Sequence, residues 1–171
     1  CYHIIANSLT KDTIFASVEY KNGENLRLQF RIIGYDVHSD ICIGIYDEEL
    51  DHNKAFYPSE IYNIVDNVQT LKIAGETKIN IGEYVSVIGN LGKNQQKAYL
   101  EGKIIDPVYK GTFFGKYYLS SPSTILTDIE ISKGISGAPI FIRDKLNKLL
   151  CVGMFNAKIG DSQQYSLGVS N

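Results

Sequence analysis

The sequence predicts an all-β fold on three observations. Short apolar segments recur along the 171 residues, polar and glycine-containing turns separate them, and hardly any stretch repeats its apolar residues at a helical period. Many short strands with regular turns are typical of β-sandwiches and β-barrels. An apolar fraction of 44% and a charged fraction of 21% are those of a soluble globular protein.

Each expected element follows from its own local pattern. The segments 14–20 and 26–32 read as two arms of a hairpin around Asn22 and Gly23, a pair that favours tight hairpin turns. A short helix is expected at 59–65, within a weakly patterned linker, and an aromatic hairpin at 109–119. Further strands, or a turn with a strand, are expected at 41–46, 70–73, 81–90, 97–105, 140–142, 149–155 and 165–169.

Charge and cysteine content exclude several classes of partner. A net charge of −2 gives no electrostatic reason to expect nucleic acid or an anionic membrane. No apolar run approaches the roughly 18 residues of a membrane span. Cys1, Cys42 and Cys151 are widely spaced and form no zinc-type cluster, so we expect free thiols, a reducing compartment and no metal or cofactor.

One stretch, from Gly134 to Pro139, carries chemical information. It places Ser136 between Gly134 and Gly137 and leads through Ala138 and Pro139 into an apolar segment. Glycine permits backbone angles that other residues avoid, and proline fixes the exit from a turn. Such a turn can present a serine hydroxyl and aim the N–H groups of Gly134 and Ser136 at one point, as an oxyanion hole requires. An ordinary turn between strands is the alternative interpretation.

The order of the titratable residues selects among serine hydrolases. All three histidines, His3, His38 and His52, precede Ser136. An α/β-hydrolase places its histidine after the serine, and a subtilisin order would need an aspartate before His3. The chymotrypsin order, in contrast, is available as His3, Asp40 and Ser136.

Several segments resemble trypsin-like serine peptidases, nearest to the HtrA-like branch. Residues 1–5 resemble the segment at the catalytic histidine, 34–43 the segment at the catalytic aspartate, and 81–90 the strand that opens the second barrel. Residues 127–139 resemble the segment leading to the nucleophile, and 152–155 the strand lining the substrate cleft.

The resemblance implies a chymotrypsin-like double six-stranded β-barrel. We expect a partial N-terminal barrel with its linker at 1–68 and a C-terminal barrel carrying the nucleophile at 69–171. The family's strands before the histidine have no counterpart here, so the first barrel is expected to be incomplete. Ile135 stands where trypsin has an aspartate that pairs with the freed N-terminus, so activation by that ion pair is not expected. Ala138 replaces a glycine usual in the family.

The resemblance also implies a serine endopeptidase acting on polypeptides. His3 would be the general base, Asp40 the carboxylate that orients it, and Asp36 is the near alternative. Gly134 and Ser136 would form the oxyanion hole, while Asn156, Ala157 and Lys158 would edge the substrate cleft. Glu130, six positions before the nucleophile, is interpreted as a surface carboxylate. The second hypothesis is an inactive protease-fold protein with a structural or binding role in a protein assembly, such as a virus particle.

Overall fold

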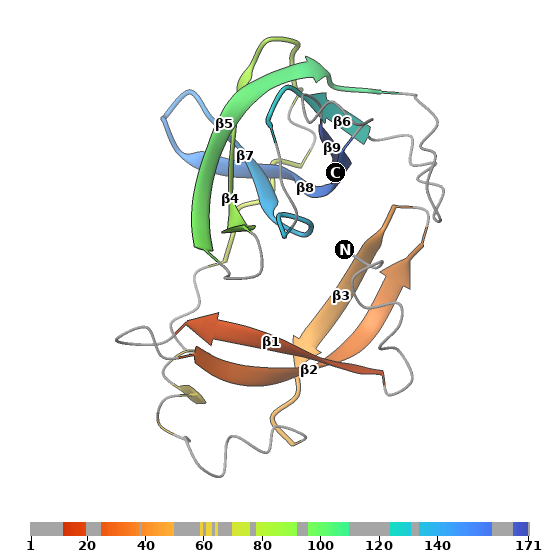
Figure 1. Ribbon diagram of the computed structural model, residues 1–171, viewed down its shortest axis with the longest axis vertical. Helices are drawn as coiled ribbons and strands as arrows, with labels where there is room; N and C mark the ends of the chain where they lie inside the picture. Colours follow the sequence, from red (N-terminus) through yellow and green to blue (C-terminus); the bar gives the residue numbers. More distant parts are fainter. Residues whose placement is uncertain are drawn as a thin grey trace. The chain divides into compact units, whose positions relative to one another are not determined.

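The protein forms antiparallel β-sheets in two compact units, seen in the computed structural model of Figure 1. The smaller unit comprises Tyr2–Asp36 and Ile41–Thr70, and the larger comprises Leu71–Asn171 together with the turn Val37–Asp40. The structure describes residues 12–19, 25–37, 39–49, 59, 61–62, 64, 70–75, 78–91, 96–109, 124–130, 134–158 and 166–170.

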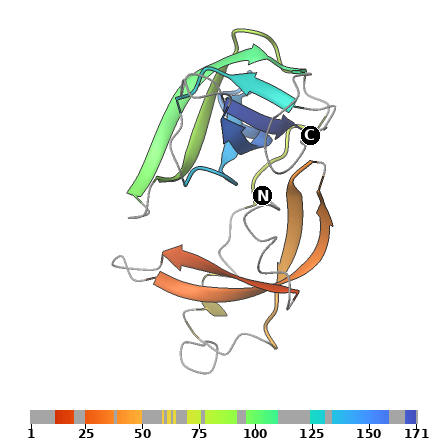
Figure 2. The same ribbon diagram turned by 45° about the vertical axis from the view of Figure 1, so that its right-hand side comes forward.

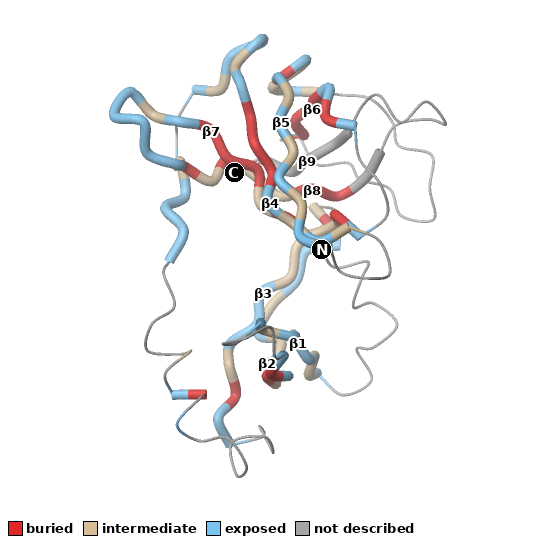
Figure 3. Tube along the Cα trace, turned by 60° about the vertical axis from the view of Figure 1, so that its left-hand side comes forward, coloured by how far each residue is buried: buried red, intermediate tan, exposed pale blue. Residues whose placement is uncertain are grey.

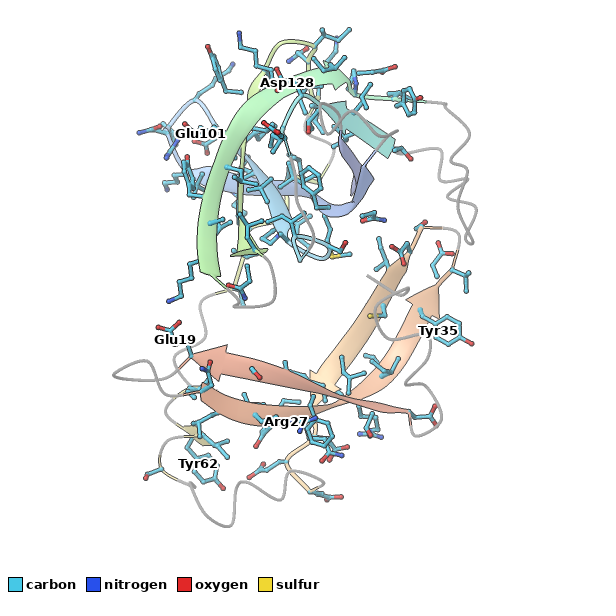
Figure 4. The ribbon with its side chains drawn as sticks, in the orientation of Figure 1. Glu19, Arg27, Tyr35, Tyr62, Glu101 and Asp128 are labelled. Atoms are coloured by element: carbon cyan, nitrogen blue, oxygen red, sulfur yellow. The ribbon has the colours of Figure 1, made fainter. Side chains whose placement is uncertain are left out.

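The smaller unit is an antiparallel three-stranded sheet in the order β1-β2-β3. Its strands are β1 (Thr13–Glu19), β2 (Asn25–Asp36) and β3 (Ile41–Tyr46). Alternation along β2 turns Leu26 and Leu28 to one face, where they pack with Ile61 of the following segment. On β1 and β2, the guanidinium of Arg27 (labelled in Figure 4) lies 4.2 Å from the ring centre of Phe15.

The larger unit is a closed six-stranded barrel in the order β4-β5-β6-β9-β8-β7. Closure leaves no free sheet edge in the ring. Figure 2 shows β6 and β9 completing the wall between β5 and β8. The strands are β4 (Tyr84–Leu91), β5 (Gln96–Asp106), β6 (Thr124–Thr127), β7 (Pro139–Arg143), β8 (Leu149–Lys158) and β9 (Ser166–Ser170).

The core of the protein is concentrated inside this barrel, where the buried segments of Figure 3 gather on β4 to β8. Val85 and Val87 alternate into the interior from β4, and their exposed fractions are 1% and 0%. Burying a side chain of this size contributes about 1.5–3 kcal/mol. The cluster contains Val85, Val87, Ile104, Ile125, Ile129, Ile135, Ala138, Ile140, Ile142, Leu150, Val152 and Phe155.

The all-β prediction is confirmed, and most expected strands agree with the structure within a few residues. At 70–73 the expected strand is reduced to a single parallel bridge between Ile73 and Cys151. Strand β6 was not predicted, because its four residues are all buried and show no alternation. Ser59, Ile61, Tyr62 and Ile64 have helical backbone, as expected for 59–65. The predicted turn at Asn22 and Gly23, and 110–119 of the predicted aromatic hairpin, lie outside the described residues.

In the part of the chain that the structure describes, no helix is long and apolar enough to cross a membrane. Cys42 and Cys151 are both free thiols and only partly exposed.

Gly102 of β5 lies close to Asp128 and Ile129, the two residues that follow β6. Asp128, labelled in Figure 4, is joined to Lys103 twice: its carboxylate accepts from the Lys103 N–H, and its own N–H donates to the Lys103 carbonyl at 3.1 Å. A Cβ atom on Gly102 would overlap the Asp128 carboxylate and lie 2.6 Å from Cγ1 of Ile129. The neighbouring connection therefore requires glycine at this position.

We predict that Gly102→Ala lowers the free energy of unfolding by about 1–3 kcal/mol, the usual result of overpacking. Urea denaturation followed by circular dichroism measures the change. Gly44→Ala is the matched strand control, because its added Cβ would meet neighbours at ordinary distances of 3.5 Å or more. Equal stability of Gly102→Ala and wild type would contradict the packing described here.

Burial raises the pKa of the Cys151 thiol above its ordinary value of 9.0, although hydrogen bonds with the backbone of Gly153 and Ile140 act in the opposite direction. The folded state therefore binds this proton more tightly than the unfolded state does. The contribution to stability is present below pH 9 and is lost as pH rises through the folded pKa.

We expect alkylation of Cys151 in the native protein to rise with pH later than in denaturing urea. Mass spectrometry of the labelled peptide measures both curves, and coincident curves would contradict the shift.

Candidate active site

The turn that carries Ser136 comes directly before β7 of the barrel. Gly134 and Gly137 flank the serine with φ values of 106° and 90°. These angles lie in the region that side chains with a Cβ avoid, so both glycines are needed to make the turn. Ser136 itself is partly buried between a buried Ile135 and a buried Ala138.

Hydrogen bonds to β8 fix the second half of this turn. The N–H of Gly137 donates to the carbonyl of Phe155 at 2.8 Å, and the N–H of Phe155 donates to the carbonyl of Ala138 at 2.8 Å. Within the turn, the N–H of Ala138 donates to the carbonyl of Ile135 at 3.0 Å. The backbone after Ser136 is therefore attached to the barrel wall.

The first half of the turn has a different hydrogen-bond pattern. Among the described residues, neither the N–H of Gly134 nor that of Ser136 donates a hydrogen bond. Among the described residues, the acceptor of the Ser136 hydroxyl is the carbonyl of Asn156, at a long distance of 3.4 Å. Long bonds of this kind are weak. Within the described part of the chain, the turn thus has two backbone donors without an acceptor and a weakly bonded hydroxyl.

Asp40 is a buried carboxylate on the short turn between β2 and β3. Its exposed fraction is 4%, and its φ of 54° is a conformation in which aspartate is enriched. Asp36, the near alternative in the sequence motif, is exposed at the end of β2. Buried carboxylates are rare unless they are hydrogen-bonded. Of the two aspartates, Asp40 has the environment expected of a group with a structural or catalytic partner.

Asn156 on β8 connects the serine turn with the aspartate turn, both of which belong to the larger unit. Its side-chain amide donates to the carbonyl of Ser39 at 3.3 Å, and its backbone carbonyl accepts from the Ser136 hydroxyl. The side chain is only 4% exposed. Asn156 therefore joins the site through its amide, a role that the sequence did not indicate because Ser39 lies 117 positions away.

Other predicted site residues are placed less completely. His3, His38 and His52 lie outside the described residues, and so do the side chains of Ala157 and Lys158, whose backbone continues β8. Glu130 is exposed, in agreement with its interpretation as a surface carboxylate. Where side chains are described, no cluster of three histidines, cysteines or carboxylates could hold a metal ion.

A shallow hollow of about 230 Å³ on the barrel is separate from the serine turn. Phe141 and the buried Ser86 are among its lining residues, and carboxylates of Glu83 and Glu101 and the guanidinium of Arg143 contribute charges of both signs. Figure 4 labels Glu101 on β5. Ser136, Asn156 and Asp40 do not line this hollow, so it has no part in the candidate site.

A closed antiparallel barrel that carries a glycine-flanked serine turn is the arrangement of the trypsin-like serine proteases, and solved structures of the HtrA type share this fold. Deg5 superposes with a TM-score of 0.62 at 16% identity, over 96% of this chain and 69% of Deg5. The MamO protease domain from Magnetospirillum magneticum gives 0.65 at 14% identity, over 96% of this chain and 75% of that one.

The HtrA-type protease AlgW, solved with a decapeptide, also matches with a TM-score of 0.65 at 16% identity. The alignment covers 96% of this chain but only 42% of AlgW. No protein-family model matches the sequence, and no curated protein matches it significantly. The chain therefore has the fold of HtrA-type trypsin-like serine proteases. At this low sequence identity, the likeness shows the fold alone.

We predict that Asn156→Ala lowers the free energy of unfolding by about 1–3 kcal/mol, because it leaves the Ser39 carbonyl without this donor and empties a buried volume. Urea denaturation measures the loss. Asn80→Ala is the matched control, since the Asn80 side chain makes only an exposed 3.5 Å contact with Glu83. A loss no larger than that of the control would contradict the bridging role of the Asn156 amide.

Proposed function

We propose that this chain is a serine endopeptidase in which His3, Asp40 and Ser136 form the catalytic triad. The observation that carries the proposal is the Ser136 turn: two positive-φ glycines present the hydroxyl, and the N–H groups of Gly134 and Ser136 donate no hydrogen bond among the described residues. Preorganised donors of this kind are what an oxyanion hole requires. The burial of Asp40 supports its assignment as the orienting carboxylate.

The reaction would follow the two-step course of acyl transfer. His3 takes the proton of Ser136 as Oγ attacks the peptide carbonyl, and the N–H groups of Gly134 and Ser136 stabilise the tetrahedral oxyanion. His3 then protonates the leaving amine, which breaks the peptide bond and leaves an acyl ester on Oγ. Water, deprotonated by His3, attacks that ester and releases the carboxylic acid with regeneration of the serine. Asp40 would hold the imidazole tautomer and stabilise the imidazolium.

A polypeptide is the substrate class that the fold supports best. AlgW, which shares the fold, has been solved with a decapeptide bound. In this chain β8 would line the substrate cleft, with Asn156, Ala157 and Lys158 at its edge. Because the side chain of Asn156 is buried, this residue would contribute through its backbone carbonyl and N–H. Ala157 and Lys158 would meet the substrate more directly. This reaction requires no metal or cofactor.

We predict that wild-type protein reacts with a fluorophosphonate probe and that Ser136→Ala abolishes both this labelling and peptide hydrolysis. Removing a triad nucleophile reduces kcat by about 10⁶-fold in a well-studied serine protease. His3→Ala should lose a comparable factor, and Asp40→Asn about 10⁴-fold because it favours the wrong imidazole tautomer. Gel-based probe labelling and mass spectrometry of a denatured casein digest measure the two activities.

Ser17→Ala is the matched control, because Ser17 lies on β1 in the smaller unit and has no place in the proposed mechanism. It should label like the wild type. Labelling of Ser136→Ala at the wild-type rate would refute the assignment of the nucleophile. A folded wild-type protein that neither labels nor cleaves peptides would support the alternative of an inactive protease fold that acts by binding.

A further inference from the structure

The residue before the nucleophile, Ile135, is inserted into the barrel core. Its exposed fraction is 2%, and it belongs to the same buried cluster as Val87 and Phe155. Its neighbour Gly134 is exposed, and Ser136 is partly buried. The chain therefore enters the core at Ile135, between an exposed residue and a partly buried one, and returns to the core at Ala138.

The space that receives Ile135 exists because β4 has a glycine at position 89. A Cβ atom on Gly89 would lie 2.6 Å from Cδ1 of Ile135 and 2.9 Å from Cβ of Ala138. Distances below 3.0 Å between carbon atoms require one of the groups to move. Both atoms belong to residues within two positions of Ser136 in the sequence. Gly89 does not have a positive φ, so its backbone conformation does not require glycine. The close approach of Ile135 and Ala138 does.

We propose that Gly89 and Ile135 are positioning residues for Ser136: the slot at Gly89 seats Ile135, and this seating sets the position of the serine and of its oxyanion N–H groups. This inference rests on the proposed peptidase function. The second half of the turn is attached to β8 by hydrogen bonds from Gly137 and Phe155, whereas the first half lacks such bonds among the described residues. The apolar seating of Ile135 thus adds a restraint to the half of the turn that contains Gly134, beside the hydrogen bond that the Ile135 carbonyl accepts from Ala138.

The seating has a functional consequence. Apolar contact does not depend on ionisation, so the restraint that Ile135 places on the turn does not change with pH. A shift of about 1 Å in a catalytic group lowers rates about 10²-fold, so a small displacement of Ile135 is sufficient to be measured.

The test is a mutant cycle in the full chain. We expect Gly89→Ala to lower the fluorophosphonate labelling rate and kcat by about 10–100-fold with a smaller change in KM, because the substrate surface is retained while the nucleophile moves. In the background Ile135→Val with Ala138→Gly, which removes both atoms that the new Cβ would meet, the same Gly89→Ala change should reduce the rates less than about 3-fold.

Gly34→Ala is the matched control, since Gly34 is also a strand glycine but its added Cβ would meet nothing within 4 Å. It should leave the labelling rate unchanged. An equal effect of Gly89→Ala in both backgrounds, or no effect in either, would overturn the proposal. If Gly89→Ala does not fold, Ile135→Ala replaces it: emptying the slot should lower labelling by a similar factor, and wild-type labelling would overturn the seating.

Amide hydrogen exchange separates this inference from the proposed function. The N–H groups of Gly137 and Ala138 are hydrogen-bonded in the native turn, so their exchange should accelerate in Gly89→Ala and recover in the variant that also carries Ile135→Val and Ala138→Gly. If exchange follows this cycle while the wild type neither labels nor cleaves peptides, the seating stands and the peptidase function fails. If the wild type is active but exchange ignores the cycle, the function stands and the seating fails.

Discussion

Closure of the six-stranded barrel is the constraint on which the candidate site depends. Because β4, β7 and β8 are neighbours in one closed ladder, the turn that enters β7 must lie between the ends of β4 and β8. This places Ser136 beside Asn156 of β8 and brings Ile135 against Gly89 of β4. A rigid barrel positions a loop of this kind more precisely than the loop could position itself, which is a common way of building sites.

The serine turn combines two kinds of restraint with different physical properties. Hydrogen bonds from Gly137 and Phe155 fix the direction in which the chain leaves the turn, because they depend strongly on angle. The buried Ile135 fixes how deeply the turn is inserted into the barrel, because packing at interior density resists both withdrawal and further insertion of its side chain. Together they hold the backbone, while the Ser136 hydroxyl makes only a long bond to Asn156 among the residues that the structure describes.

The sequence predicted the strands better than it predicted the contacts between them. Period-two alternation is a local signal, so β3 was located to the residue, whereas β6 was missed because all four of its residues are buried. Asp40 and Ser136 could be selected from short motifs and chain order. The amide of Asn156 and the slot at Gly89 could not, because their partners Ser39 and Ile135 are distant in sequence and are brought together only by the fold. His3 remains a sequence-based assignment.

The choice between an enzyme and a scaffold concerns the turns of Asp40 and Ser136, which combine unusual backbone angles with buried polar groups. Asp40 is held in a left-handed conformation, and burial of its carboxylate is unfavourable unless the carboxylate is hydrogen-bonded. Among the described residues, the N–H groups of Gly134 and Ser136 donate to no protein acceptor. Strained backbone of this kind persists only where the surrounding structure holds it in place, and it is concentrated at functional sites. Asn156 connects the turn of Asp40 with the turn of Ser136 through the Ser39 carbonyl and the Ser136 hydroxyl, so both turns belong to one part of the larger unit. The fold by itself is compatible with a working nucleophile and with an inherited turn, and the reactivity of Ser136 is what distinguishes the two.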